Sequence, residues 1–350
     1  MRDRRVREIR DEEVAMSELP TLCFYGDPAA YASIPSVCYD ERSQAVMEAV
    51  GSKGFYTHEI RDGIHYVTEG WYFMLVAEHD DGLIVVDAPP TIGSDFLGNN
   101  IPKAIAEISD KPVTHVIYSH HHRDHIGSAN LFPPEATIIA HKECADYVES
   151  AEDPQRPAPT VTFDDTYTLE VGGQSLRLDY HGDIHCPGNI FIYAPAQKIL
   201  MNVDVIFPGW VPFSSLAMAS HLRGFLRGHD VALGYDFDTF VPGHLTRLGT
   251  RSDVEIQQAY FQDLVDTAMK YLDDTSPARP GAGVEPNFMS AAEDAGGFEN
   301  AWLVFDTYLN GVAEKVTDEV LPRWVGRLAA ADVFTRSHAW EVVERLRIDA

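Results

Sequence analysis

The pattern of apolar and polar positions first predicts a strand-rich segment. From Gly63 onward, short β-branched and aromatic runs alternate with polar turns, which is typical of paired strands. The sequence Asp80-Asp81-Gly82 is a hairpin signal between two of these runs. The predicted strands cover residues 64–67, 71–78 and 83–87.

Strands and helices alternate in the next part of the chain. The spacing of apolar residues predicts helices over 96–109, 125–131 and 143–150, and strands over 113–118 and 137–140. After a Pro-rich loop at 153–159, a second series of strands is predicted over 167–171, 175–180, 190–193, 199–203 and 239–241, with helices at about 216–231 and 253–273. Because the same order occurs twice, we expect an α/β fold in which two β-sheets pack face to face, with helices outside.

The remaining stretches suggest how the chain divides. We expect residues 1–20 to be a flexible leader, 21–273 the main domain, 274–286 a Pro-rich linker and 287–350 a helical C-terminal extension. The clearest helix of the extension is predicted over 301–328. The extension either covers the substrate cleft or contacts a second copy in a homodimer, and the sequence leaves both open.

Composition and charge narrow the classes of partner. Of the 350 residues, 45% are hydrophobic and 23% charged, as in soluble globular proteins. The formal net charge of −27 argues against nucleic acid or an anionic membrane as the main partner. A small substrate is expected instead, and it can be anionic because a bound metal reverses the local charge.

Cysteine usage and the termini point to the cytoplasm. Cys23, Cys38, Cys144 and Cys186 form no CxxC pair, so a zinc ribbon is excluded and a disulfide framework is not expected. The first 20 residues lack the apolar core of a signal peptide, and no run is long enough for a membrane span. A reducing cytoplasm is therefore the expected compartment.

The densest cluster of chemical groups lies in residues 119–127, Ser-His-His-His-Arg-Asp-His-Ile-Gly. Four histidines and an aspartate occur within six positions, directly after a predicted strand, where α/β sheets carry their chemistry. His120 and His122 alternate on an extended backbone and should point to one side. Asp124 and His125 follow a bend and can face a second centre about 3.5–4 Å away. The cluster therefore predicts a metal site.

Further ligands must come from elsewhere in the chain, because zinc requires three or four nitrogen, oxygen or sulfur ligands. Three metal-competent residues also lie at the ends of predicted strands. His185 lies in a turn-rich loop, while Asp204 and His244 directly follow strands. We expect these three side chains to complete the site.

The order HxHxDH, then H-x-P-G, a strand ending in Asp, and P-G-H resembles the metallo-β-lactamase superfamily over residues 64–245. Asp87 resembles the early strand-ending aspartate of the family. The resemblance implies an αββα sandwich of two mixed β-sheets with the site at one edge. It also implies the ligand set: His120, His122 and His185 for a first metal, Asp124, His125 and His244 for a second, and Asp204 bridging both.

The residue at the bridging position indicates a branch of this family. Classical β-lactamases use a cysteine for the second metal, whereas Asp204 is similar to the ligand of glyoxalase-II and lactonase-type members. Quorum-quenching lactonases carry a tyrosine three residues after this aspartate, and here that position is Phe207. The chain therefore differs from that lactonase group.

The predicted cofactor is a pair of zinc ions, with iron or manganese as alternatives. Such a pair makes hydroxide available near neutral pH, and we expect a metal-bridging hydroxide to attack the carbonyl of an ester, lactone or thioester. The local net charge is about +1 when two divalent ions, two carboxylates and the hydroxide are summed, and this charge suits an anionic substrate. Asp124 is the expected catalytic residue, which orients the hydroxide and then passes its proton to the leaving group.

Three other functions share this site. A β-lactamase-type amidase would differ only in substrate, an iron-dependent oxidoreductase would use the same fold, and a metal-stabilised binding protein would show no turnover. Nearby polar residues have simpler interpretations than ligation. We expect His121 to be structural or to line the cleft, His181 to be exposed or supporting, Cys186 to pack, and Asp87 to hold the site loops by hydrogen bonds.

Overall fold

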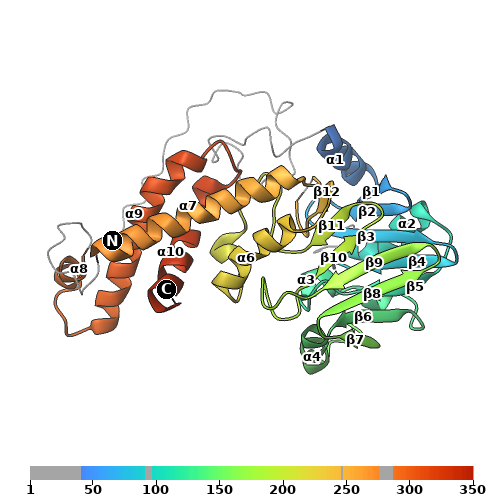
Figure 1. The fold of residues 1–350 in the computed structure, drawn as a ribbon, viewed down its shortest axis with the longest axis horizontal. Coiled ribbons are helices and arrows are strands. Elements are labelled where there is room, and N and C mark those ends of the chain that lie inside the picture. The colour runs from blue at the N-terminus through green and yellow to red at the C-terminus, as the bar shows by residue number, and fades with distance from the viewer. Residues whose placement is uncertain (1–40, 91–96, 246, 276–286, 350) are drawn as a thin grey trace.

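The computed structural model describes residues 41–90, 97–245, 247–275 and 287–349. Two β-sheets pack face to face, and further helices extend from one side of this sandwich (Figure 1). The expected αββα architecture with C-terminal helices is confirmed. The predicted leader, residues 1–20, lies outside the described residues.

The first sheet has seven strands in chain order. The first four pair in antiparallel fashion: β1 (Tyr56–Arg61), β2 (Ile64–Thr68), β3 (Phe73–His79) and β4 (Gly82–Val86). The last three are parallel: β5 (Val113–Ile117), β6 (Thr137–His141) and β7 (Val161–Phe163). Parallel neighbours need long crossovers. Helix α2 (Leu97–Ile108) connects β4 to β5, and α4 (Lys142–Ala151) connects β6 to β7.

The second sheet has five strands in the order β12-β11-β10-β9-β8. Four are antiparallel: β8 (Thr166–Val171), β9 (Gln174–Asp179), β10 (Phe191–Ala194) and β11 (Ile199–Asn202). The fifth, β12 (Thr239–Val241), runs parallel to β11 after the crossover helix α6 (Leu222–Leu233). Both sheets are therefore mixed, and their loops gather at the sandwich edges.

Alternate residues along a strand belong to two different apolar cores, one between the sheets and one beneath the outer helices. Leu75 of β3 faces the layer between the sheets together with Ile192 and Met201, all fully or almost fully buried. Val76, the next residue of β3, packs with Ile101 of α2 on the outer face. Because side chains alternate across a strand and both faces are covered, these strands read as nearly continuous apolar runs.

The C-terminal helices share a core with the second sheet. They are α7 (Arg251–Thr275), α8 (Phe288–Asp294), α9 (Ala301–Trp324) and α10 (Ala331–Asp349), whereas α1 (Glu41–Lys53) lies near β1. One buried cluster runs from Phe191 of β10 through Phe225 of α6 to Val312 of α9 and Val342 of α10. Helix α7 packs against both α9 and α10 (Figure 1). The division of the chain near 274–286 stays a prediction.

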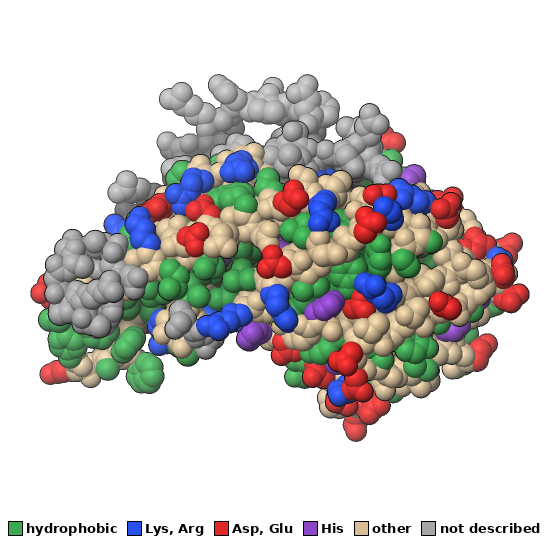
Figure 2. Space-filling view, in the orientation of Figure 1, with side chains coloured by type: hydrophobic (Ala, Val, Ile, Leu, Met, Phe, Trp, Pro, Cys, Tyr) green, Lys and Arg blue, Asp and Glu red, His purple; other side chains and the backbone are tan. Residues whose placement is uncertain are grey.

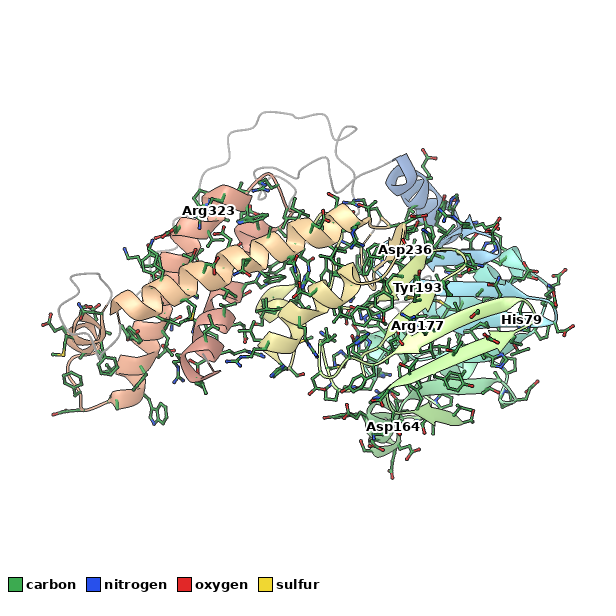
Figure 3. All side chains as sticks on the ribbon, in the orientation of Figure 1. His79, Asp164, Arg177, Tyr193, Asp236 and Arg323 are labelled. Carbon is green, nitrogen blue, oxygen red and sulfur yellow. The ribbon has the colours of Figure 1, made fainter. Side chains whose placement is uncertain are left out.

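Polar contacts fix the register of these helices. The hydroxyl of Tyr260 on α7 lies 2.8 Å from Nδ1 of His338 on α10, and both residues are fully buried. Arg323 of α9, labelled in Figure 3, donates to Asp263 of α7 at 2.8 and 2.9 Å. The indole of Trp324 donates to the same carboxylate at 2.7 Å. Buried polar groups such as Tyr260 and His338 are stable only when paired, so this contact selects one packing of the bundle.

Two predicted helices differ from the structure. The helix expected over 125–131 is instead the short helix α3 (Arg123–Ile126) followed by a 3-10 turn at Ala129–Leu131. Residues 216–231 were expected to form a single helix, but α6 begins at Leu222, and Ser215 to Met218 have φ between 52° and 59°. This left-handed turn costs about 1–2 kcal/mol per residue for side chains other than glycine. Tertiary contacts overcome that local cost, since Leu216 is fully buried and Ser215 N donates to Ser337 Oγ of α10 at 3.1 Å.

The surface agrees with the acidic composition. Figure 2 shows Asp and Glu side chains over much of the visible face, with a cluster over α4 and β7. Among the described residues, no helix combines the length and the apolar character that a bilayer crossing needs.

Gly224 allows α6 to lie against the 181–188 loop, because a Cβ at this position would overlap the carbonyl oxygen of Asp183. We expect Gly224→Ala to destabilise the protein by about 1–3 kcal/mol, the usual cost of overpacking. Gly51→Ala is the matched control, because nothing lies within 4 Å of the place that its added methyl group would occupy on helix α1. Thermal unfolding followed by circular dichroism should show a lower midpoint for Gly224→Ala alone. Equal midpoints would contradict the close contact.

Candidate metal centre

The seven predicted ligands meet at one edge of the sandwich. His120 and His122 follow β5, and Asp124 and His125 belong to the short helix α3 (Arg123–Ile126). The other three lie after strands of the second sheet or in its loops: His185 between β9 and β10, Asp204 after β11, and His244 after β12. The structure therefore brings together all the residues that the sequence selected.

Asp204 lies at the centre of this group. Its Oδ2 atom is 3.4 Å from His120 Nε2, 3.2 Å from His125 Nε2 and 3.5 Å from His185 Nε2. Its Oδ1 atom is 2.9 Å from His244 Nε2. Oδ2 thus faces histidines of both predicted ligand sets, and Oδ1 faces His244 of the second.

The histidine nitrogens face one another at distances suited to a cation. His185 Nε2 lies 3.2 Å from His122 Nδ1, and His125 Nε2 lies 3.1 Å from His244 Nε2. Nitrogen ligands of a tetrahedral zinc are about 3.3–3.4 Å apart, since each zinc–nitrogen bond is about 2.0–2.1 Å. His120 Nε2 is buried without a hydrogen-bond partner. These side chains fit divalent metal ions.

The donor atoms fall into three overlapping groups whose atoms lie within 4.8 Å of one another. One contains His120, His122, His185 and Cys186, a second contains His120, His125 and Asp204, and a third contains Asp124, His125 and His244. Two of the groups correspond to the two centres that the resemblance implied, and the other links them through Asp204.

For His120, His185 and Asp204 the electrostatics favour the protonation states that ligands need. Burial lowers the pKa of His120 well below its usual value and that of His185 to about 4, so both imidazoles are neutral. Burial opposes ionisation of Asp204, but the charges of His125 and His244 outweigh it and hold its pKa well below the usual range. Burial also disfavours a charged His125, yet Asp204 raises its pKa to about 9. The site therefore stabilises positive charge next to Asp204.

Hydrogen bonds behind the donor atoms orient the rings. Ser119 Oγ lies 2.9 Å from His120 Nδ1, and the carbonyl oxygen of Trp71 lies 3.1 Å from His244 Nδ1. Asp87 is fully buried and accepts from Ser119 N at 2.8 Å, which is the supporting role expected of it. Gly243 is needed beside Asp204, because an added Cβ would lie 3.0 Å from Asp204 Oδ1 and 2.5 Å from a methyl group of Val203.

Three neighbours of the ligands have different surroundings. The His121 ring stacks on Tyr147 at 4.2 Å between centroids. His181 Nε2 lies 3.0 Å from the hydroxyl of Tyr235, which is a supporting contact. Cys186 is buried and lies 3.7 Å from His121 Nδ1, but it also belongs to the first donor group. The Cys186 sulfur thus lies among the donor atoms, a position that a packing role alone does not need.

Two residues near the site were not selected as functional from the sequence. The hydroxyl of Tyr72 donates to Asp124 Oδ2 at 3.3 Å, and its ring centroid lies 4.5 Å from that of His244. Glu69 is almost fully buried, accepts from Tyr72 N at 3.3 Å, and has its pKa raised to about 8 by burial. The sequence contained one indication, the polar loop Glu69-Gly70 before an aromatic strand. That indication was weak, because aromatic residues in a strand more often belong to the core.

Three of the predicted ligands are accessible to solvent. The Asp124 side chain is 46% exposed, that of His244 is 24% exposed and His122 is partly exposed, whereas His120, His125 and His185 are buried. The accessible face of the cluster therefore includes Asp124, His122 and His244.

Helix α7 supports the segment that follows Asp204. Gln257, fully buried, accepts from Phe207 N at 2.8 Å and donates to the carbonyl oxygen of Val205 at 2.6 Å. The Gln257 amide also lies 2.9 Å from His229 Nε2 of α6. The Phe207 ring in turn stacks on His244 at 6.0 Å between centroids. The Gln257 side chain of α7 thus supports the backbone directly after Asp204.

The left-handed turn connects the same segment to His185. After the turn, Ser220 N donates to the carbonyl oxygen of His185 at 2.8 Å. Before it, Val211 N donates to the Ala329 carbonyl, and the Phe213 carbonyl lies 3.0 Å from His338 Nε2 of α10. The segment from 205 to 220 is therefore fixed at both ends by the site and in its middle by the helices.

Comparisons with known proteins agree with this geometry. A family model of the metallo-beta-lactamase superfamily matches residues 69–244. The alpha subunit of 2,4-dinitroanisole O-demethylase from Nocardioides sp. strain JS1661 is 30% identical over 209 residues, which are 58% of this chain and 62% of that protein. Linear primary-alkylsulfatase from Pseudomonas sp. strain ATCC 19151 is 21% identical over 258 residues, which are 60% of this chain and 47% of that protein. The chain thus spans about half to three fifths of the curated relatives it matches.

Solved structures show the same fold at low identity. The stereoselective inverting sec-alkylsulfatase Pisa1 from Pseudomonas sp. has a TM-score of 0.61 at 14% identity, covering 86% of this chain and 52% of that one. A metallo-beta-lactamase from Pontibacter korlensis has a TM-score of 0.50 at 19% identity, covering 59% of this chain and 99% of that one. The larger coverage means that the fold shared with the alkylsulfatase extends into the C-terminal helices.

Gln257→Leu tests whether α7 positions Asp204. The change leaves a buried backbone N–H and a buried backbone carbonyl without hydrogen-bond partners. Each unpaired group costs about 1–3 kcal/mol of stability. We expect a lower unfolding midpoint and about tenfold weaker metal retention, as for other residues that orient ligands. Equilibrium dialysis against a chelator followed by elemental analysis measures the retention. Gln258→Leu on the same helix is the control, because the Gln258 amide donates to Asp230 at the surface. Equal retention by both variants would rule out the positioning role.

Proposed function

The chain belongs to the metallo-β-lactamase superfamily, and we propose that it is a metal-dependent hydrolase with two metal ions. The observation that carries the proposal is the convergence of six further side chains around the buried carboxylate of Asp204. A buried charge surrounded by imidazoles is costly unless a cation is bound.

We assign His120, His122 and His185 to one ion, and Asp124, His125 and His244 to the other. Asp204 presents Oδ2 toward three histidines and Oδ1 toward His244, which suits a bridging ligand. Zinc is the proposed metal because the donors are imidazole and carboxylate, and iron or manganese would accept the same set.

Bound divalent ions would make hydroxide available near neutral pH and would polarise the substrate carbonyl. The chain's own contribution begins with Asp124, the most exposed of the carboxylates in the site. An ionised carboxylate there accepts a proton from the attacking water and holds it for the leaving group. The buried side of the cluster excludes bulk water, which strengthens the effect of these charges.

The proposed substrate is a small ester, lactone or thioester, whose anionic form would match the positive site. A second candidate is favoured by the relatives, which are named as an O-demethylase subunit and as alkylsulfatases. An activated aryl ether or an alkyl sulfate would also release an anionic oxygen. Each of these reactions releases a leaving group that carries negative charge, on oxygen or, for a thioester, on sulfur.

A substrate panel combined with metal analysis tests the proposal. The panel contains a 4-nitrophenyl ester, an acyl lactone, a thioester, a chromogenic cephalosporin, 2,4-dinitroanisole and dodecyl sulfate. We expect about two metal ions per chain and turnover of at least one oxygen ester without oxygen uptake. Oxygen consumption with iron as the dominant metal would indicate an oxidoreductase instead. Bound metal without turnover of any compound would indicate a binding protein.

Single substitutions test the ligand assignment. We expect His122→Ala and Asp204→Ala each to reduce turnover to background and metal content to one ion per chain or fewer. The reason is that each change removes one of the few protein donor atoms that hold a metal ion. His65→Ala is the control, since His65 lies on β2 outside the donor groups. Full activity in Asp204→Ala would exclude the bridging role of this carboxylate. Elemental analysis and initial rates provide the two measurements.

A further inference from the structure

Tyr72 is held in place by the same backbone contacts as His244. The two residues form an isolated antiparallel bridge. On either side of it, Phe73 N donates to the Gly243 carbonyl and Leu245 N donates to the Trp71 carbonyl, both at 3.1 Å. The start of β3 is therefore paired with the loop that carries His244, and Tyr72 cannot shift without moving a proposed ligand.

The direction of the Tyr72 side chain is also fixed. Its ring centroid lies 4.5 Å from that of His244 and 5.2 Å from that of His125. Its hydroxyl donates to Asp124 Oδ2 at 3.3 Å. Ring packing and a hydrogen bond together hold the phenol over the exposed half of the site, which is the preorganisation that catalytic donors require.

Cationic side chains near the site are engaged with other groups. Arg123 and Arg156 both contact Asp153, and Arg247 pairs with Asp253. Phe207, which stacks on the same His244 ring, has no donor on its side chain. The Tyr72 hydroxyl thus offers a proton donor at the point where a substrate meets Asp124.

We propose that Tyr72 is a catalytic residue whose hydroxyl donates a proton to the leaving-group oxygen of the substrate. This role rests on the proposed function and refines it. In ester hydrolysis, the water oxygen bonds to the acyl carbon and one water proton passes to Asp124. The bond from the acyl carbon to the leaving oxygen then breaks, and that oxygen keeps the electron pair.

Tyr72 and Asp124 together account for the protons transferred in the reaction. The leaving oxygen takes the phenolic proton of Tyr72. The protonated Asp124 then becomes the donor in its contact with Tyr72 and returns a proton to the phenolic oxygen. Water has then supplied a hydroxyl group to the acid and a hydrogen to the alcohol. A phenol, with a pKa near 10, can protonate an alkoxide readily, whereas a stabilised phenolate needs little help. The dependence on Tyr72 should therefore increase with the basicity of the leaving group.

Tyr72→Phe tests this role with two esters of one acyl group, 4-nitrophenyl butyrate and benzyl butyrate. Proton donation is typically worth 10²–10⁴-fold. We expect kcat for the benzyl ester to fall about 100-fold and kcat for the nitrophenyl ester to fall less than about threefold. Metal content and KM should be unchanged. Tyr56→Phe is the control, because its hydroxyl lies near His58 on β1.

Binding of 4-nitrophenolate provides a readout that does not depend on turnover. If Tyr72 hydrogen-bonds the leaving oxygen, Kd measured by absorbance on the metal-loaded protein should be about tenfold weaker in Tyr72→Phe. Equal losses for both esters, loss of metal, or equal phenolate binding by the two proteins would overturn the proposal. If the unmodified protein hydrolyses neither ester, the proposed ester hydrolase fails, and the phenolate experiment still decides the role of Tyr72. Absence of phenolate binding in both proteins also counts against it.

Discussion

The buried carboxylate of Asp204 is the constraint on which the rest of the structure depends. An ionised group of this kind cannot remain in a protein interior without compensation, and here four histidine side chains approach it within 3.5 Å. Asp204 also has φ of 65°, an uncommon conformation for a residue other than glycine. Charge and backbone strain of this size persist only where surrounding structure fixes them. The histidines, the close approach of Gly243 and the helices behind the loop provide that support.

The C-terminal helices consequently belong to the architecture of the site. Gln257 holds the backbone directly after Asp204, and α10 holds the strained turn at 215–218 through Ser337 and His338. Both contacts join a loop of the sandwich to helices that follow it in the chain. From the sequence, the extension was expected to cover a cleft or to contact a second copy. The structure adds a third role, because the extension directly supports loops of the sandwich. A continuous apolar core between α6, α7, α9 and α10 explains how these contacts stay aligned.

Shared metal ligands do not set the reaction of a superfamily member, because the same fold serves many chemistries. In this chain the proposed ligands form a largely buried group, while Asp124, His122, His244 and Tyr72 form its accessible side. These accessible residues come from separate elements: the start of β3, the segment from β5 into the short helix α3, and the loop after β12. The apolar residues after Asp204, among them Phe207, border the same side.

The sequence alone predicted the two-sheet architecture, which is confirmed, and the proposed ligands with their order, because these depend on local patterns. Histidines at alternate positions after a strand, and polar residues at other strand ends, are visible without coordinates. It also predicted a helix over 216–231, where part of the segment adopts a left-handed turn. That turn, the support from Gln257 and the position of Tyr72 beside Asp124 were decided by the tertiary structure. Each depends on residues 50 or more positions apart in the chain, and local propensity contains no information about such contacts.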